Sequence, residues 1–311
     1  MKMMIFILEM VLPVLIMIIL GFTCRNKGWV TKEGMVGIKA FISKVCIPVI
    51  LFRAFYVAEY NWNSLIMFVI IFICCCLALV IGYFLRRFVA NSPVLPFLLS
   101  GFEVGMLGYP LFGLVVGTDK LYYLATLDLG QTFFVYTVFL ALLKGLAGNK
   151  PSLGKSLIEM SKNTAMRGVA LGIIFGVTGL GTKLLDSMIG GIFQASVDMI
   201  VSPTVALILV MVGYELSLKK NLIGPVFKTI LFRILINGFL LVIASLIIFQ
   251  IIPFDKNMMI ALMLLFSLPA SFIIPIYAEG EQEAEFISTT LSVNTLVTVL
   301  LYILIVIYSV N

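Results

Sequence analysis

The 311-residue chain contains no histidine and little charge. The absence of histidine excludes catalysis by Ser-His-Asp or Cys-His pairs, HExxH metalloprotease chemistry and haem ligation by histidine. Charged residues make up only 12% of the chain, whereas 62% is hydrophobic and the mean hydropathy is +1.17. This composition lies far outside that of soluble globular proteins and predicts a polytopic membrane protein.

The five cysteines form no metal-binding or disulfide pattern. Cys24, Cys46 and the run 74–76 lie in or beside apolar stretches without paired spacing. No nucleophile or metal motif is recognisable either, so we expect no enzymatic activity, no metal and no cofactor. The net charge of +6 comes from residues in loops between apolar runs rather than from a basic block, and we therefore expect no nucleic-acid partner.

The remaining sequence is organised as ten apolar runs. Each is roughly long enough to cross a hydrocarbon core of ~30 Å, which predicts an all-α protein with ten transmembrane helices embedded in membrane lipid. A lysine before the first run would also fit a signal peptide, but Glu9 and the lack of a small-residue cleavage pattern favour an uncleaved span. The runs cover about 4–22, 35–57, 62–85, 94–116, 121–143, 165–181, 188–214, 222–250, 257–278 and 286–309.

One connection, residues 146–164, is longer than the others and rich in Gly, Pro, Asn, Ser and Lys, which predicts a solvated linker. It separates five spans in residues 1–145 from five in residues 165–311. Lysine and arginine concentrate in this linker and in every second loop around it. By the positive-inside rule these loops are cytoplasmic, so we expect a multi-pass protein of the cytoplasmic membrane with both termini outside.

Prolines suggest that the two halves are related. An odd number of spans per half makes the halves enter the membrane in opposite directions, so similar halves would form an inverted repeat. Prolines interrupt the second and fourth span of each half: Pro48 and Pro110, then Pro203, and finally Pro269 with Pro275. Broken helices at matching places of inverted halves indicate a substrate site near the membrane midplane of a secondary transporter. For any single proline, a packing kink is the alternative.

The most interrupted stretch is residues 101–113, GFEVGMLGYPLFG, in the fourth run. Gly105, Gly108 and Pro110 predict that its backbone leaves the helical path, with amides and carbonyls left unpaired. Such a break is tolerated only beside protein or a water-filled cavity, because hydrocarbon offers no partners. The segment and its one carboxylate, Glu103, are therefore the first candidates for a substrate- or ion-binding site.

Polar groups inside the spans are costly and need a reason. Glu103 is expected to load and release a proton, since burial favours its neutral form, or to contribute to a sodium site; contacts to backbone amides or a lysine are the structural alternative. Asp128 and Gln131 share one helical face and either bind ligand or hydrogen-bond the broken fourth helix. Lys44 lies deeper than snorkelling easily explains, which suggests contact with an anionic substrate, or with Glu103 or Asp128.

Two further patterns concern the second half. Half-helix N-termini present positive dipole ends to a site at the breaks, which favours an anion, and Pro269, Ser271 and Pro275 would belong to that site. In the sixth run, glycines recur every four residues at Gly168, Gly172 and Gly176, which predicts close helix packing.

The runs also carry recognisable motifs. They read LPVLIMIILGF in the first run, IPVILFRAF in the second, GMLGYPL in the fourth, LDLGQTFFVYT in the fifth and LPASFIIPIYAEGEQEAEFISTTLS from the ninth onward. Their order and spacing over nearly the whole chain resemble the bacterial auxin efflux carrier family, which includes malate and malonate permeases and is related to plant PIN auxin carriers. The resemblance implies two inverted five-helix repeats, as in bile-acid sodium symporters, with broken fourth and ninth helices that cross at their prolines.

The resemblance also implies a scaffold of helices 1, 2, 6 and 7, a moving domain of helices 3–5 and 8–10, elevator-like alternating access and a homodimer. Two positions depart from the family pattern. Members commonly have Asn-Thr-Gly before the fourth-helix Gly-x-Pro, where this chain has Glu103. They often have an asparagine after the first proline of the ninth helix, where this chain has Ile273, with Ser271 as the nearest polar group.

We therefore expect a secondary active transporter, a symporter of a small organic anion such as a mono- or dicarboxylate, coupled to H+ or Na+. A sodium-coupled carrier of an amino acid or another amphipathic metabolite is the alternative within transport. A channel would allow only downhill flux, whereas a carrier would show saturation and concentrative uptake.

Overall fold

The computed structural model describes residues 2–56, 62–89, 91–146, 158, 161–216, 219–277 and 280–310. Every regular element within these ranges is a helix, and none is a strand, so the predicted all-α class is confirmed. Most of the predicted linker, 146–164, falls outside the described residues.

Seven helical stretches are long and apolar enough to cross a membrane. They identify a multi-pass membrane protein. The sixth and ninth predicted runs hold shorter apolar helices, at Thr164–Val177 and Lys256–Ser267. The seven stretches are Lys32–Tyr56, Trp62–Phe88, Leu95–Val116, Tyr122–Leu146, Gly190–Glu215, Ile223–Ile251 and Glu281–Val310.

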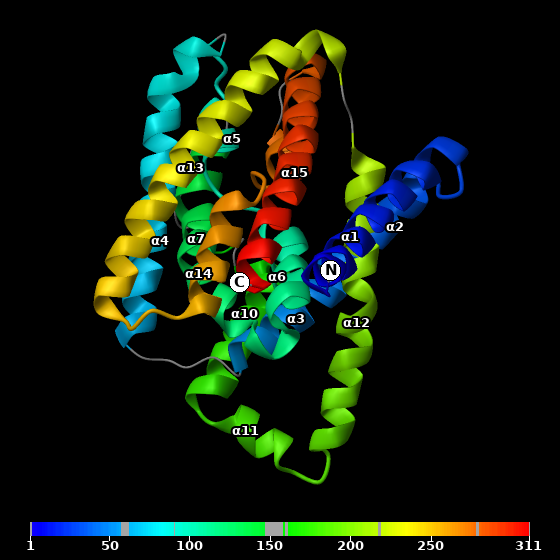
Figure 1. Cartoon of the computed structure of the whole chain (residues 1–311), viewed down its shortest axis with the longest axis vertical. Coiled ribbons are helices and arrows are strands. Elements are labelled where there is room, and N and C mark those ends of the chain that lie inside the picture. Colours follow the sequence, from blue (N-terminus) through cyan, green and yellow to red (C-terminus); the bar gives the residue numbers. More distant parts are fainter. Residues whose placement is uncertain are drawn as a thin grey trace.

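Within the described ranges the helices follow one another along the chain (Figure 1). The first half comprises α1 (Lys2–Lys27), α2 (Lys32–Phe41), the π-helical turn η1 (Ile42–Cys46), α3 (Ile47–Tyr56), α4 (Trp62–Leu85), η2 (Arg86–Phe88), α5 (Leu95–Leu99), the π-helical turn η3 (Val104–Gly108), α6 (Tyr109–Val116), η4 (Thr118–Lys120), α7 (Tyr122–Phe134), η5 (Val135–Phe139) and α8 (Leu140–Leu146). The second half comprises α10 (Thr164–Val177), α11 (Leu180–Leu185), α12 (Gly190–Glu215), η6 (Lys220–Leu222), α13 (Ile223–Ile251), α14 (Lys256–Ser267), η7 (Ile274–Tyr277) and α15 (Glu281–Val310).

The helices pack in two groups. In the first, which we call the α12 group, α1 lies along α12 and α3 lies along α10; α2 and α11 belong to it as well. In the second, the α15 group, α4 packs on α5 and α7, while α13 and α14 pack on α15. Figure 1 shows α4 and α13 on one side, α1 and α12 on the other, and α15 between them. The groups meet where α1 contacts α15 and α3 contacts α7.

Glycines bring the helices of the α12 group together at backbone distance. A Cβ added to Gly168 of α10 would overlap the carbonyl oxygen of Pro48 on α3, and one added to Gly172 would lie 2.8 Å from the carbonyl oxygen of Phe52. On the α1–α12 contact, a Cβ at Gly213 would overlap the backbone of Ile18. The predicted small-residue surface of the sixth run is therefore confirmed at Gly168 and Gly172.

The break in the fourth span lies earlier than predicted. Non-helical backbone runs from Ser100 to Glu103, after which the chain is helical from Val104 to Val116. Gly101 has a φ of +66°, in the left-handed region that favours glycine. Pro110, which the sequence suggested as the interruption, lies in α6 directly after the π-helical turn η3, and the helix continues through it.

Of the other predicted proline breaks, the structure contains the one in the ninth span but not those in the seventh and second spans. α14 ends at Ser267 and the chain is non-helical over 268–273, so the ninth span breaks at Pro269 as predicted. α12, in contrast, continues through Pro203, so the predicted break in the seventh span is wrong. An interior proline removes one helical hydrogen bond and can kink a helix without ending it. The predicted break at Pro48 is also wrong: the helical stretch Lys32–Tyr56 continues through it and changes only to the π-helical turn η1 just before it.

Candidate functional site

The two non-helical segments, 100–103 and 268–273, are bonded to each other, and we call them the paired breaks. The amide of Glu103 donates to the carbonyl oxygen of Pro269 at 2.9 Å. The Glu103 carboxylate accepts the amide of Phe272 at 2.7 Å and that of Met106 at 3.4 Å. One carboxylate thus serves as N-cap of η3 and as a partner for the opposite break, which is the structural role considered for it from the sequence.

Arg233 of α13 binds both breaks. Its guanidinium donates to the carbonyl oxygens of Leu98 and Gly101 at 2.8 Å and to that of Leu268 at 2.9 Å. The side chain is only 2% exposed, and within the described part of the chain no carboxylate pairs with it. This buried cation supplies donors for carbonyls that helix geometry leaves without one.

Polar residues of α15 complete the ninth break. With its amide oriented so that all neighbours are satisfied, Asn294 accepts from Nε of Arg233 at 3.0 Å and from the amide of Ala270 at 3.2 Å. The hydroxyl of Thr298 donates to the carbonyl oxygen of Ser267 at 2.6 Å. The breaks are therefore supported by side chains from two other helices, α13 and α15.

Asp128 and Gln131 of α7 are both buried and both contact the fourth span. Gln131 Nε2 donates to the carbonyl oxygen of Phe102 at 2.8 Å and to Asp128 at 3.3 Å. The Asp128 carboxylate also accepts the hydroxyls of Tyr109 at 2.9 Å and Thr132 at 3.1 Å. The arrangement corresponds to the structural alternative, in which these residues hold the broken backbone of the fourth helix.

The predicted glycines and Ser271 lie at or next to the breaks. Gly105 and Gly108 belong to η3, and a Cβ added to Gly108 would come within 2.9 Å of the Leu268 side chain, so the fourth span packs closely on the ninth break here. Ser271 lies within the ninth break, and its carbonyl oxygen accepts the amide of Ile274 at 3.3 Å.

Lys44 is exposed on η1, and its side chain makes no hydrogen bond or ion pair with any described residue. The expected pairing with Glu103 or Asp128 is therefore not seen in this structure.

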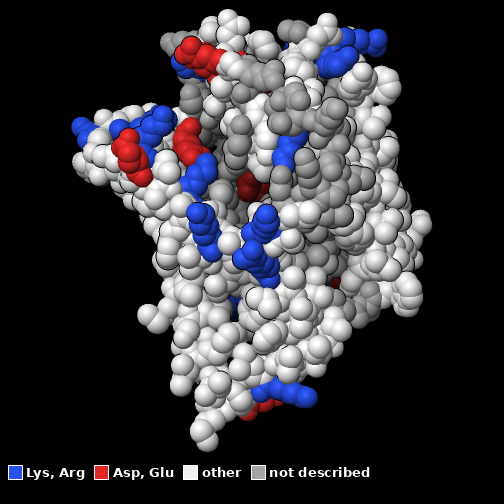
Figure 2. All heavy atoms as spheres, turned by 180° about the vertical axis from the view of Figure 1, so that it is seen from behind, with Lys and Arg blue, Asp and Glu red and all other residues white. Residues whose placement is uncertain are grey.

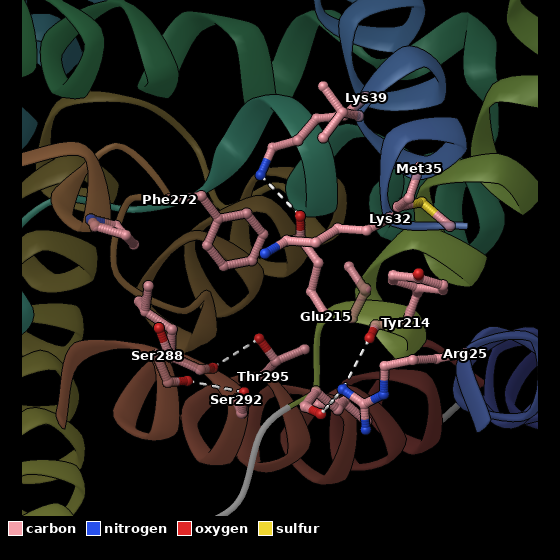
Figure 3. A pocket seen from close by; sticks show the side chains of 15 residues that line it. Arg25, Lys32, Met35, Lys39, Tyr214, Glu215, Phe272, Ser288, Ser292 and Thr295 are labelled. Carbon is pink, nitrogen blue, oxygen red and sulfur yellow. Dashed lines mark hydrogen bonds and ion pairs between the residues drawn. The ribbon is translucent and has the colours of Figure 1, made fainter. Parts of the chain in front are cut away.

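A cavity of about 800 Å³ separates the two helix groups next to the breaks (Figure 3). From the α15 group, Phe272 and Pro275 of the ninth span and the hydroxyl residues Ser288, Ser292 and Thr295 of α15 line it. Because the Phe272 amide is a partner of Glu103, the cavity reaches the paired breaks. From the α12 group come Arg25, Lys32, Met35, Lys39, Tyr214 and Glu215.

Three basic side chains and one carboxylate line this cavity. Arg25 donates to the carbonyl oxygens of Tyr214, at 3.0 Å, and Leu216, and so holds the C-terminal end of α12. Lys39 pairs with Glu215 at 2.9 Å. Lys32 has neither a hydrogen bond nor an ion pair among the described residues. Figure 2 shows basic side chains gathered around a hollow in one face of the molecule.

Sequence reasoning missed Arg233, Asn294 and the lysines of α2. Arg233 carried a usable signal, because an arginine within an apolar run costs about 2.5–3.5 kcal/mol on insertion scales and needs a partner. Lys32 precedes the second run and looked like an ordinary loop charge, while Lys39 lies near the start of that run and was not singled out. No cluster of three or more His, Cys, Asp or Glu that could hold a metal ion occurs among the described residues.

Comparisons with protein-family models and with curated protein sequences found no relative of this chain. No protein-family model matches the chain, and no curated protein sequence matches it. Membership of the auxin efflux carrier family therefore stays a prediction from the order and spacing of the motifs.

Proposed function

We propose that this protein is a secondary carrier that moves a small organic anion, a mono- or dicarboxylate, across the cytoplasmic membrane by alternating access. The observation that carries the proposal is the cavity of about 800 Å³ between two helix groups. It has a basic lining, with Lys32 and Lys39 on one wall and hydroxyl groups on the other, and it reaches the paired breaks at Phe272.

The proposed architecture is the ten-helix inverted repeat of the auxin efflux carriers. Under that repeat the contact between α1 and α12, the first and seventh spans, is equivalent to the contact between α10 and α3, the sixth and second. Both contacts are extensive and both rely on glycine, which supports the equivalence. The α12 group then corresponds to the scaffold and the α15 group to the moving domain. A homodimer with both termini outside completes the proposal, as the family resemblance and the loop charges suggest.

Glu103 gives this carrier a way to couple transport to protons. As a carboxylate it accepts amides from both sides of the paired breaks. A protonated carboxyl is a weaker acceptor and would loosen the tie to Phe272, so proton binding and the relative position of the breaks depend on each other. Proton binding on one side of the membrane and release on the other would then drive accumulation of the anion.

One observation favours a second candidate. Lys39 and Glu215 place both charge signs at the cavity wall. Opposite charges side by side also suit a zwitterion, so a sodium-coupled carrier of an amino acid is the alternative.

Uptake into proteoliposomes tests the proposal. A panel of labelled mono- and dicarboxylates, with labelled alanine for the alternative, would be offered under imposed proton or sodium gradients. We expect saturable, concentrative uptake of a carboxylate driven by the proton gradient. Glu103→Gln should still bind this substrate but fail to accumulate it, whereas Asp186→Asn, an exposed control at the end of α11, should behave as wild type.

The outcomes separate the alternatives. If no carboxylate is transported or stabilises the protein, the anion-carrier proposal fails, and sodium-driven alanine uptake would replace it. Flux that only ever runs down the substrate's own gradient would indicate a channel. Full accumulation by Glu103→Gln would refute the coupling role while leaving the carrier intact.

A further inference from the structure

We infer that Glu215 is an internal counter-ion that the substrate anion displaces from Lys39, so that this ion pair determines both affinity and release. The inference rests on the proposed anion-carrier function and assigns a specific binding residue within it.

The pair is placed for such an exchange. Nζ of Lys39 lies 2.9 Å from Oε1 of Glu215, and the two side chains are 38% and 40% exposed. Figure 3 shows them pointing toward one another in the cavity, beside Phe272. Phe272, whose amide binds Glu103, lines the same cavity, so an anion held at Lys39 would lie near the paired breaks.

The other cations of the cavity are less suited to this role. Arg25 is committed to the carbonyl oxygens of Tyr214 and Leu216. Lys32 has no competing carboxylate among the described residues and can attract anions into the cavity. Among the described residues, Lys39 is the one of the three that pairs with a carboxylate, and a substrate carboxylate offers it the same charge and the same acceptor atoms.

Exchange at Lys39 is energetically easy. A partly exposed ion pair contributes little, because each charge keeps much of its hydration. A substrate carboxylate can therefore replace Glu215 without leaving the ammonium group unpaired. When the α15 group moves away, Glu215 pairs with Lys39 again. This competition prevents the anion from remaining bound to the α12 group.

A double-mutant cycle tests the inference on the purified full-length protein in nanodiscs, with succinate and benzoate as calorimetric probes. Glu215→Gln should tighten binding of the better probe roughly two- to fivefold, the range expected for removal of a competitor in an exposed pair. Lys39→Gln should weaken binding by a similar two- to fivefold, because the substrate carboxylate occupies a pair of the same partial exposure. In the double variant the gain in affinity from Glu215→Gln should vanish, because the Lys39 ammonium group that this substitution frees is no longer present.

Asp198→Asn provides the matched control. Asp198 pairs with Arg53 between α12 and α3, is half exposed, and is not part of the cavity wall, so its loss should leave probe affinity unchanged. Glu215→Asn repeats the test if Glu215→Gln fails to fold.

Each failure has a distinct meaning. If wild type binds neither probe, the carboxylate-carrier proposal and this inference both fail. If wild type binds but Glu215→Gln gives no gain, or the gain persists without Lys39, only the counter-ion role is wrong. Loss of binding in Lys32→Gln but not in Lys39→Gln would likewise overturn the assignment of Lys39.

Discussion

Arg233 shows how a single side chain can make a broken membrane helix tolerable. Three backbone carbonyls, those of Leu98, Gly101 and Leu268, have this guanidinium as donor. A guanidinium carries five N–H groups in a fixed planar arrangement, so one arginine can serve several acceptors that a lysine would serve less well. The residue joins the fourth and ninth spans through the eighth.

Arg233→Ala is expected to destabilise the protein by about 3 kcal/mol or more, because three buried carbonyls lose a charged donor at once. The measurement is thermal unfolding followed with a thiol-reactive fluorophore, since Cys24, Cys46, Cys74 and Cys75 are buried in the folded protein.

Lys219→Ala is the comparison for Arg233→Ala. Lys219 pairs with Glu285 at 2.7 Å on the surface, and its hydrogen bond to that carboxylate raises the pKa of the lysine. Removing it should leave the unfolding temperature nearly unchanged. An Arg233→Ala variant with the same unfolding temperature as Lys219→Ala would contradict the structural role of Arg233.

At the scale of elements, helices approach at backbone distance in both groups: in the α15 group, a Cβ on Gly130 of α7 would overlap the carbonyl oxygen of Phe68 on α4. The α15 group contains the breaks and the polar residues that serve them. The α12 group is held by helices in backbone contact, with Gly168 and Gly172 of α10 against α3 and Gly213 of α12 against α1. Small residues permit close approach without side-chain interdigitation, which suits a rigid unit in lipid.

Gly168→Ala is expected to lower stability by about 1–3 kcal/mol, the range for overpacking a tight contact, because the added Cβ would overlap the backbone of Pro48. The same thiol-based unfolding measurement reports it. Gly191→Ala is the matched control on α12: nothing lies within 4 Å of its added Cβ, so it should be neutral or slightly stabilising. Equal unfolding temperatures for the two variants would argue against backbone contact between α10 and α3.

At the scale of the molecule, the cavity lies where the two groups face each other. α2 and the end of α12 form one wall, while α15 and the ninth span form the other. The walls would have to move relative to one another for the cavity to open alternately to the two sides of the membrane. Helix packing within each group need not change during such a motion.

A cross-link between the walls is therefore expected to abolish transport. Met35→Cys on α2 and Ser292→Cys on α15, in a background without native cysteines, would be joined by a short bis-maleimide, and proteoliposome uptake would be measured before and after. The control is Arg53→Cys with Asp198→Cys, which joins α3 to α12 within one group and should leave most uptake intact. Undiminished uptake with the first pair linked would rule out movement between the groups.

The sequence by itself determined the membrane character, the all-helical class and the approximate ranges of the helices, because hydropathy is a property of consecutive residues. It also marked 101–113 and the ninth run as interrupted, since glycine and proline act on their own backbone. Glu103, Asp128 and Gln131 also stood out in the sequence, because a polar group in an apolar run needs a partner wherever it lies.

Only the tertiary structure decided which partners those groups have. The fourth span breaks at Gly101 rather than at Pro110, because carbonyls at this point find Arg233 from a helix more than a hundred residues away in the chain. Lys39 and Glu215 are likewise unremarkable in sequence and become an ion pair in a cavity only when α2 meets the end of α12. Satisfying buried backbone and charge depends on neighbours in space, and a linear pattern does not specify them.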